Sequence, residues 1–179
     1  MGEGWLSGLD EVRRVVTPGG AALAVGPLTA ERHDQLMWMF ADAVARGEGY
    51  PHVPPLTRQV FEETWVRPVS VVVGAVGSTG ELAGAYYLKP NQPGVGAHIA
   101  NAGYLVSRRL RGEGVGRLLV EDSITRAPLV GFDAIQFNFV FADNPARSLY
   151  ERLGWQVVGR VPGGGGPGRD ALIYWRAVP

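Results

Sequence analysis

The chain has 179 residues, about one domain's length, with 17 basic side chains, 17 acidic side chains and no cysteine. The missing cysteine excludes a disulfide framework, cysteine-ligated metal centres and a thiol nucleophile. The zero net charge argues against nucleic acid or a membrane surface as a partner. We therefore expect a single domain over residues 1–179, in which residues 1–19 form a poorly defined N-terminal extension.

The N-terminus carries Glu3 early and has no apolar run behind a basic segment, so it does not resemble a signal peptide. The longest uncharged stretch, residues 90–107, contains prolines, glycines and polar amides that do not suit a membrane span. Together these features predict a cytoplasmic protein without a membrane anchor.

Hydrophobic periodicity and turn residues divide the chain into strands and helices. Leu36, Phe40 and Val44 recur at helical spacing, with Thr29 as a candidate cap, whereas β-branched and aromatic runs mark the strands. Gly77-Ser-Thr-Gly80 between two such runs is typical of a hairpin. The predicted strands lie at 21–25, 69–76, 82–88, 99–106, 134–141, 155–161 and 171–177. The predicted helices lie at 29–47, 58–66, 114–127 and 145–153.

Residues 99–140 read as strand, helix, strand, a unit whose two strands run parallel, while the hairpin requires antiparallel neighbours. We therefore expect an α/β (α+β) fold with a mixed, mostly antiparallel sheet of six to seven strands flanked by about four helices. Ligands in such sheets bind beyond the carboxyl ends of parallel strands. Val106, Ser107 and residues 141–144 are therefore expected to border a ligand site.

A glycine-rich turn, Arg111-Gly-Glu-Gly-Val-Gly-Arg117, lies between the predicted strand at 99–106 and the helix at 114–127. Its glycines keep side chains away from the first helical turn, so backbone N–H groups and the positive end of the helix dipole can face an anion. The spacing Arg-x-x-Gly-x-Gly occurs twice here, beginning at Arg109 and at Arg111. Only the copy that begins at Arg111 places both of its glycines, Gly114 and Gly116, within the helix. The alternative is that these glycines only allow close packing of the helix on the sheet.

This turn resembles the pyrophosphate-binding motif of the GNAT family of acetyl-CoA-dependent N-acetyltransferases. The segment from Asn144 to Trp155 is similar to that family's Asn-x-x-A-x-x-x-Y-x-x-x-G-F pattern, with Ser148 and Trp155 at the Ala and Phe positions. The two motifs cover residues 98–160 well. Further phrases resemble the proline-analogue branch, the azetidine-2-carboxylate N-acetyltransferases, at residues 88–91, 93–94, 98–104 and 136–140.

The resemblance implies transfer of an acetyl group from acetyl-CoA, without a metal, to the amine of a small molecule such as a proline analogue or another amino acid. It implies that the turn holds the pyrophosphate and that a neighbouring strand guides the pantetheine arm. Arg147 or the pair Arg108 and Arg109 would meet the adenosine phosphate. The implied coenzyme-binding residues are Leu105, Val106, Arg111, Gly112, Gly114, Val115, Gly116, Arg117, Asn144 and Arg147.

Tyr150 is the candidate acid for the departing thiolate, because a phenol with its ordinary pKa near 10 stays protonated at neutral pH. The alternative is a helix tyrosine packed on the core. Asn144 precedes Pro145, a favoured residue at the first helical position, which makes Asn144 a natural N-cap. The resemblance adds a catalytic role for Asn144 in contacting the thioester or the pantetheine.

Asn101 and Asn138 interrupt apolar strands, where an amide without partners is costly, so we expect both to face the cleft. The resemblance implies that they hold the carboxylate and amine region of the acceptor; otherwise the strand backbone satisfies them. It also implies that Tyr104 shares this pocket. Strand alternation places Tyr104 on the opposite face from Asn101 unless a bulge intervenes.

The group that accepts the ammonium proton is left open among His98, His52, Glu48 and a relayed water. The three histidines lack metal-ligand spacing. Residues 47–55 are a candidate lid over the acceptor.

Competing functions are acetylation of a peptide N-terminus or an aminoglycoside, and a non-enzymatic sensor of acyl-CoA. A homodimer is compatible with the aromatic content, although the sequence indicates no interface.

Overall fold

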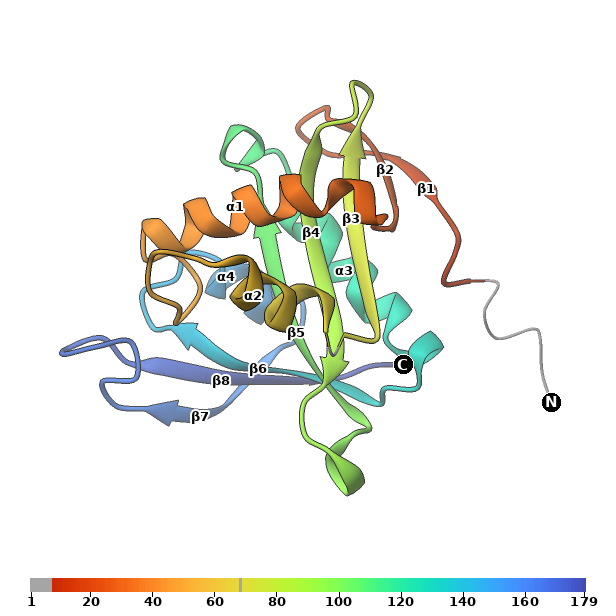
Figure 1. Ribbon diagram of the computed structural model, residues 1–179. Helices are drawn as coiled ribbons and strands as arrows, with labels where there is room; N and C mark the ends of the chain where they lie inside the picture. Colours follow the sequence, from red (N-terminus) through yellow and green to blue (C-terminus); the bar gives the residue numbers. More distant parts are fainter. Residues whose placement is uncertain (1–7, 68) are drawn as a thin grey trace.

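The computed structural model describes residues 8–67 and 69–179, so residues 1–7, where the absence of a signal peptide is predicted, lie outside it. The described residues form one mixed sheet in the order β1-β2-β3-β4-β5-β6-β8-β7 (Figure 1). The strands are β1 (Arg13–Val16), β2 (Ala22–Pro27), β3 (Val71–Gly77), β4 (Leu82–Pro90), β5 (Ile99–Val106), β6 (Ala134–Phe141), β7 (Gln156–Val161) and β8 (Ala171–Ala177). The helices are α1 (His33–Ala45), α2 (Arg58–Phe61), α3 (Val115–Arg126) and α4 (Arg147–Arg152).

The predicted α/β class with a mixed sheet is confirmed, and the eight described strands exceed the six to seven expected. The additional strand is β1, which lies in the segment expected to be poorly defined and pairs antiparallel with β2. Its sequence, Arg-Arg-Val-Val, does not alternate polar and apolar residues, so no strand signal is visible. Its side chains nevertheless alternate between half-buried and exposed positions.

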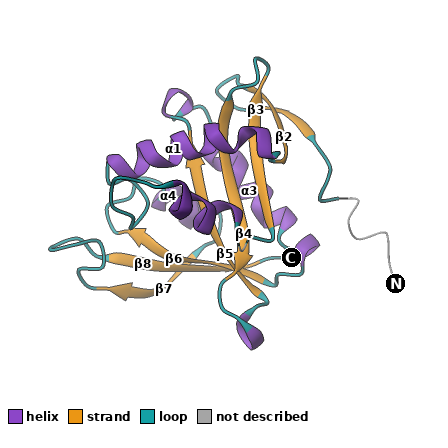
Figure 2. Ribbon diagram, in the orientation of Figure 1, coloured by secondary structure: helices purple, strands orange, loops and turns teal. Residues whose placement is uncertain are grey.

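The helices cover both faces of the sheet (Figure 2). On one face, Leu36 and Phe40 of α1 and Trp65, in the π-helical turn that follows α2, pack with Tyr87 of β4. On the other face, Leu119 of α3 packs in the main core together with residues of α4. β4 is buried on both faces over most of its length, as expected of a central strand.

β5 and β6 run parallel, as predicted, but their pairing extends only from Ile99–Asn101 to Ala134–Gln136. Beyond this point the two strands separate, and β6, β8 and β7 cross the direction of β3–β5 in Figure 1. In β6, Asn138 and Phe139 oppose the single residue Ile173 of β8, which is a β-bulge. The gap and the bulge together open the sheet at the carboxyl end of β5.

A buried ionic network fastens the N-terminal segment to α3. Asp122, which is 1% exposed, accepts hydrogen bonds from Arg126 Nε at 2.9 Å and from the Tyr86 hydroxyl at 2.7 Å, and it pairs with Arg13 of β1. Arg126, 3% exposed, donates its remaining hydrogens to backbone carbonyls of residues 8–11. Buried charges of this kind are tolerated because each one is paired and hydrogen-bonded.

Candidate active site

A cavity of about 290 Å³ opens where β5 and β6 separate, bounded by the loop that follows α1. Four residues singled out from the sequence line it together: Asn101 on β5, Asn138 on β6, and Asn144 and Tyr150 beyond the carboxyl end of β6. Their convergence follows from the parallel pairing of β5 and β6, which places the ends of both strands at one edge of the sheet.

The cavity wall carries a chain of amide hydrogen bonds. The Tyr87 hydroxyl donates to Asn101 Oδ1 at 3.3 Å, and Asn101 Nδ2 donates to the Gln136 carbonyl at 3.2 Å. Gln136 Nε2 donates to Asn138 Oδ1 at 2.7 Å, and Asn138 Nδ2 donates to Asn91 Oδ1 at 2.6 Å. Asn101 therefore has a strand-backbone partner, while Asn138 is exposed at the bulge.

Tyr104 does not offer its hydroxyl to this cavity. The hydroxyl lies on the α3 face and donates to Ser123 Oγ at 2.7 Å, because the Ser123 proton is itself donated to the Val120 carbonyl. The pairing of β4 with β5 shows no register shift, so the strand alternates without a bulge. The carbonyl of Tyr104 borders the cavity and accepts the Tyr50 hydroxyl at 3.0 Å. Tyr104 therefore lines the cavity without a free hydroxyl.

Tyr150 reaches the cavity from α4, on the opposite side of the sheet from α1. Its ring packs against Phe137, with ring centroids 4.8 Å apart, and only 8% of the residue is exposed. No group among the described residues hydrogen-bonds its hydroxyl. Burial, followed by the nearby Tyr174, raises the pKa of Tyr150 to about 12. The hydroxyl is therefore a proton donor throughout the neutral range.

Asn144 has a turn-forming role in the structure. Its Oδ1 accepts the Ala146 N–H at 2.9 Å, just before α4 begins at Arg147. This bond is of the Asx type, in which a side-chain oxygen satisfies a backbone donor at the start of a turn. The Nδ2 group takes no part in it, and Asn144 lines the cavity.

The glycine-rich turn leaves the start of α3 without a cap. Gly114 is the N-cap residue, with φ +88°, and no side chain accepts a hydrogen bond there. Within the described part of the chain, five backbone N–H groups of this turn have no acceptor, namely those of Gly112, Gly114, Val115, Gly116 and Arg117. Uncapped donors at a helix N-terminus are suited to an anion.

The three glycines of the turn differ in what they require. Gly112 and Gly114 have positive φ angles of +84° and +88°, and a Cβ on Gly114 would lie 2.8 Å from Pro18 Cδ. A Cβ on Gly116 would meet only Val106 Cγ2, at an ordinary 3.6 Å. Backbone conformation therefore explains the first two glycines, and neither conformation nor crowding explains the third.

The backbone of β5 has one edge free beside the gap. The bonds from Ser107 N to the Ala83 carbonyl and from Asn91 N to the Ile99 carbonyl show that odd-numbered residues of β5 pair with β4. The N–H and C=O groups of Val106 consequently point toward the separating β6. Leu105, also predicted to line the pantetheine arm, points its backbone groups at β4 and is 6% exposed.

Two predicted phosphate contacts are engaged in ion pairs. Arg111 Nη2 lies 2.6 Å from Glu48 Oε2, and Arg46 Nε lies 3.0 Å from Glu48 Oε1. Arg117 pairs with Glu121 one turn along α3 at 2.8 Å. All of these groups are at least partly exposed, so an incoming phosphate can compete for the arginines.

Arg147 has several hydrogen-bond partners within the protein. Its Nη1 donates to the Ala142 carbonyl at 2.6 Å and its Nε to the Tyr174 hydroxyl at 3.0 Å, so the guanidinium ties the end of β6 to α4 and β8. Arg108 and Arg109 are exposed, and no ion pair is found for either among the described residues. Arg108 and Arg109 therefore have fewer competing contacts than Arg147, and both alternatives for the adenosine phosphate stay predictions.

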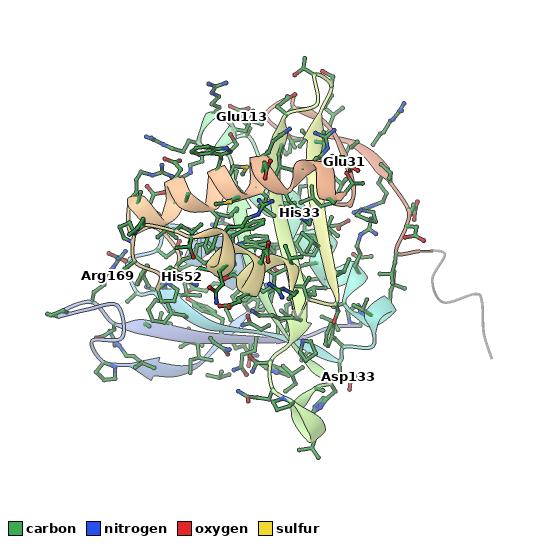
Figure 3. All side chains as sticks on the ribbon, viewed as in Figure 1. Glu31, His33, His52, Glu113, Asp133 and Arg169 are labelled. Carbon is green, nitrogen blue, oxygen red and sulfur yellow. The ribbon has the colours of Figure 1, made fainter. Side chains whose placement is uncertain are left out.

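The candidate bases differ in position. His98 lies outside the cavity, with Nδ1 2.9 Å from the Val95 carbonyl. Hydrogen bonds from Arg111 and then Arg46 lower the pKa of Glu48 to about 2, which makes it a poor proton acceptor. His52 lines the cavity, on the same side of the molecule as Arg169 (Figure 3).

His52 is held in one tautomer. Thr64 Oγ1 donates to the Val60 carbonyl at 2.7 Å, so it can only accept from His52 Nε2, 3.4 Å away. Nδ1 then carries the lone pair, and it is buried without a partner in the described structure. Burial, and secondarily Lys89, lowers the pKa of His52, so the imidazole is neutral at neutral pH.

Lys89 and Tyr87 also line the cavity but are not among the residues predicted from the sequence. They share a face of β4 because alternate residues of a strand point the same way. Lys89 is the partner of Asn101 in the β4–β5 register. That pairing brings them to the cavity, and it is visible only in the structure.

Within residues 8–67 and 69–179, no group of three or more His, Asp or Glu side chains is arranged to hold a metal ion. None of the helices in the same ranges is both long enough and apolar enough to cross a bilayer.

The fold and motifs match known acetyltransferases. The solved structure of a GCN5-related N-acetyltransferase from Kribbella flavida is 34% identical, with a TM-score of 0.80 over 87% of this chain and 98% of that one. A phosphinothricin acetyltransferase from Sinorhizobium meliloti, solved in complex with AcCoA, shares the fold with a TM-score of 0.76 at 17% identity, covering 87% of this chain and 88% of that one.

Among curated proteins, the N-acetyltransferase aca1 of Schizosaccharomyces pombe is 44% identical over 85 residues, which are 47% of this chain and 41% of that protein. The chain thus spans less than half the length of the curated relatives it matches. The family model for the acetyltransferase (GNAT) family matches residues 32–155. This match takes in the cavity residues, the glycine-rich turn and the Asn144 segment, and the chain belongs to the acetyltransferase (GNAT) family.

Proposed function

We propose that the protein is an acetyl-CoA-dependent N-acetyltransferase that acetylates the amine of a small acceptor, such as a proline analogue or another amino acid. The observation that carries the proposal is that β5 borders both features: its residues 101–104 line the cavity with Tyr150 and Asn144, and Val106, two residues further on, lies beside Gly116 at the uncapped start of α3. A coenzyme held by the turn could then present its thioester to the proton donor in the cavity.

The residues present fit the coenzyme. Five unpartnered N–H groups in residues 112–117 suit a diphosphate, and the free backbone edge at Val106 suits the amide groups of a pantetheine arm, as in strand addition. Arg111 and Arg117 add charge near the diphosphate, and Arg108 and Arg109 are available for the adenosine phosphate. The coenzyme supplies an acetyl thioester to the cavity.

The cavity residues have separate roles in the transfer. A neutral acceptor amine is required. Because the unprotonated Nδ1 of the cavity residue His52 is buried, a relayed water, rather than direct contact with His52, is expected to take the ammonium proton. The Tyr150 hydroxyl donates a proton to the departing thiolate sulfur. We expect the Nδ2 group of Asn144, which is free of the turn bond, to contact the thioester or the pantetheine.

The acceptor is expected to be zwitterionic. Asn101 and Asn138 present amide groups that bind a carboxylate and an amine equally well. The acidic side chain at the cavity is Glu63, which is exposed and accepts Gln59 Nε2 at 2.8 Å. A polycationic aminoglycoside would require a more acidic lining. The name of aca1, an N-acetyltransferase, is consistent with this class of reaction.

The test measures thiol release from acetyl-CoA with a panel of amines, comprising azetidine-2-carboxylate, hydroxyproline, dipeptides and aminoglycosides. We expect turnover with the free amino acids. Calorimetry with acetyl-CoA and CoA is run in parallel. Binding of the coenzyme without turnover of any amine would favour the sensor function, and a lack of binding would contradict the proposal.

A further inference from the structure

We propose that Lys89 selects acceptors that carry a carboxylate, by supplying the positive charge of the acceptor cavity. This inference rests on the proposed function and adds the property that decides which amines are acetylated.

Lys89 is the single lysine of the chain, and it stands in the cavity rather than on the surface. It is the register partner of Asn101 on the neighbouring strand, so the ammonium and the Asn101 amide belong to one wall. Its Nζ lies 4.9 Å from the centre of the Tyr87 ring, an arrangement that fixes the head of a flexible side chain. The residue is only half-buried, which leaves its head accessible to a ligand.

The ammonium group has no counter-ion within the described structure. Ten arginines form ion pairs there, whereas no carboxylate lies within 4.0 Å of Lys89. Burial lowers the pKa of Lys89, and burial, followed by the charge of Lys89, lowers the pKa of His52, so positive charge is disfavoured in this cavity. An unpaired cation in a partly buried site favours an anionic ligand, because the ligand restores the interaction that burial removed.

The position of Lys89 also orients the acceptor. Asn101 lies where β5 and β6 still pair, and Tyr150 lies beyond the point where they separate. An acceptor whose carboxylate binds Lys89 and Asn101 directs its amine toward Tyr150 and the opening that borders the start of α3. An amine of similar shape without a carboxylate lacks this anchor.

The test compares azetidine-2-carboxylate with its uncharged carboxamide, at saturating acetyl-CoA, in the wild type, Lys89→Met and Lys89→Arg. We expect Lys89→Met to raise the KM for the carboxylate about 10- to 100-fold, as for loss of a charged hydrogen bond, and to change the KM for the carboxamide less than ~3-fold. Lys89→Arg should retain most of the preference for the carboxylate.

Equal losses of Lys89→Met on both acceptors, or a wild type that prefers the carboxamide, would overturn the inference while leaving the acetyltransferase function intact. If neither acceptor is turned over, equilibrium binding of proline to the CoA-loaded protein is measured instead. The inference requires proline to bind Lys89→Met more weakly than the wild type. Equal binding to both proteins, or undetectable binding to both, would overturn it. Calorimetry with CoA alone should give the same affinity for all three proteins, which shows that the fold is intact.

Discussion

The carboxylate of Glu48 lies 2.6 Å from the guanidinium of Arg111, and this ion pair joins the loop after α1 to the glycine-rich turn. Glu48 is followed in the chain by Gly49 and Tyr50, which line the acceptor cavity, and Arg111 lies just before the start of α3. Phosphate binding at Arg111 would therefore compete with the contact that holds the loop expected to act as a lid.

Glu48→Gln should make stability less dependent on acidity. The folded-state pKa of Glu48, about 2, lies below its ordinary value of 4.5, so its contribution is present above pH 4.5 and is lost as the pH falls toward 2. Because the pair is partly exposed, we expect a difference of ~1 kcal/mol or less at pH 7. Urea unfolding of both proteins at pH 7, 4.5 and 3 measures it, and a difference that does not shrink on acidification would contradict the assignment.

Gly114→Ala and Gly116→Ala should behave differently although both glycines lie in one motif. Alanine at 114 is strained at φ +88° and crowds Pro18, so we expect a loss of about 1–2 kcal/mol in unfolding free energy and weaker CoA binding. Alanine at 116 meets only ordinary protein contacts and should stabilise the protein by up to ~1 kcal/mol, but its methyl group would lie beside Val106, where the coenzyme is proposed to bind, so CoA affinity should fall.

Thermal unfolding and calorimetry with CoA, run on both glycine variants, provide the two readouts. A stable Gly116→Ala protein that binds CoA as tightly as the wild type would show that the ligand does not contact the turn on the Val106 side.

Tyr150→Phe should lower kcat by about 10²- to 10⁴-fold, the usual range for loss of a general acid, with the affinity for CoA unchanged. Since burial raises the pKa of this hydroxyl to about 12, its deprotonation should produce no fall in wild-type kcat below pH 10. Tyr174→Phe is the matched control, because that hydroxyl donates to Glu151 at 2.9 Å outside the cavity. Equal kcat values for wild type and Tyr150→Phe would exclude Tyr150 as the acid.

Asp122→Asn should destabilise the fold by about 3–5 kcal/mol, because it leaves the buried guanidinium of Arg126 without its counter-charge. Tyr86→Phe removes one hydrogen bond to the same carboxylate and should cost about 1–2 kcal/mol. Urea unfolding at pH 7 ranks the two variants. If Tyr86→Phe proved the more damaging, the network would not depend on the buried charge.

The sequence was sufficient for elements whose patterns are local. The bounds of β5, β6 and β8 agree with the predicted runs at 99–106, 134–141 and 171–177, because uninterrupted apolar strands flanked by turn residues carry their own signal. The helix at α3 and the hairpin of β3 and β4 were equally visible. β1 was not, since its four residues owe their conformation to pairing with β2.

At the site, the sequence predicted that Asn101, Asn138, Asn144 and Tyr150 lie near one another, and they line one cavity because chain order and parallel pairing bring the ends of β5 and β6 together. Tertiary packing decided where side chains point. The Tyr104 hydroxyl bonds to Ser123, which is distant in sequence, and the Arg147 guanidinium bonds to the Ala142 carbonyl, which lies outside the Asn144–Trp155 motif. Lys89 enters the cavity only through its register with Asn101, and long-range pairing of that kind leaves no trace in a local pattern.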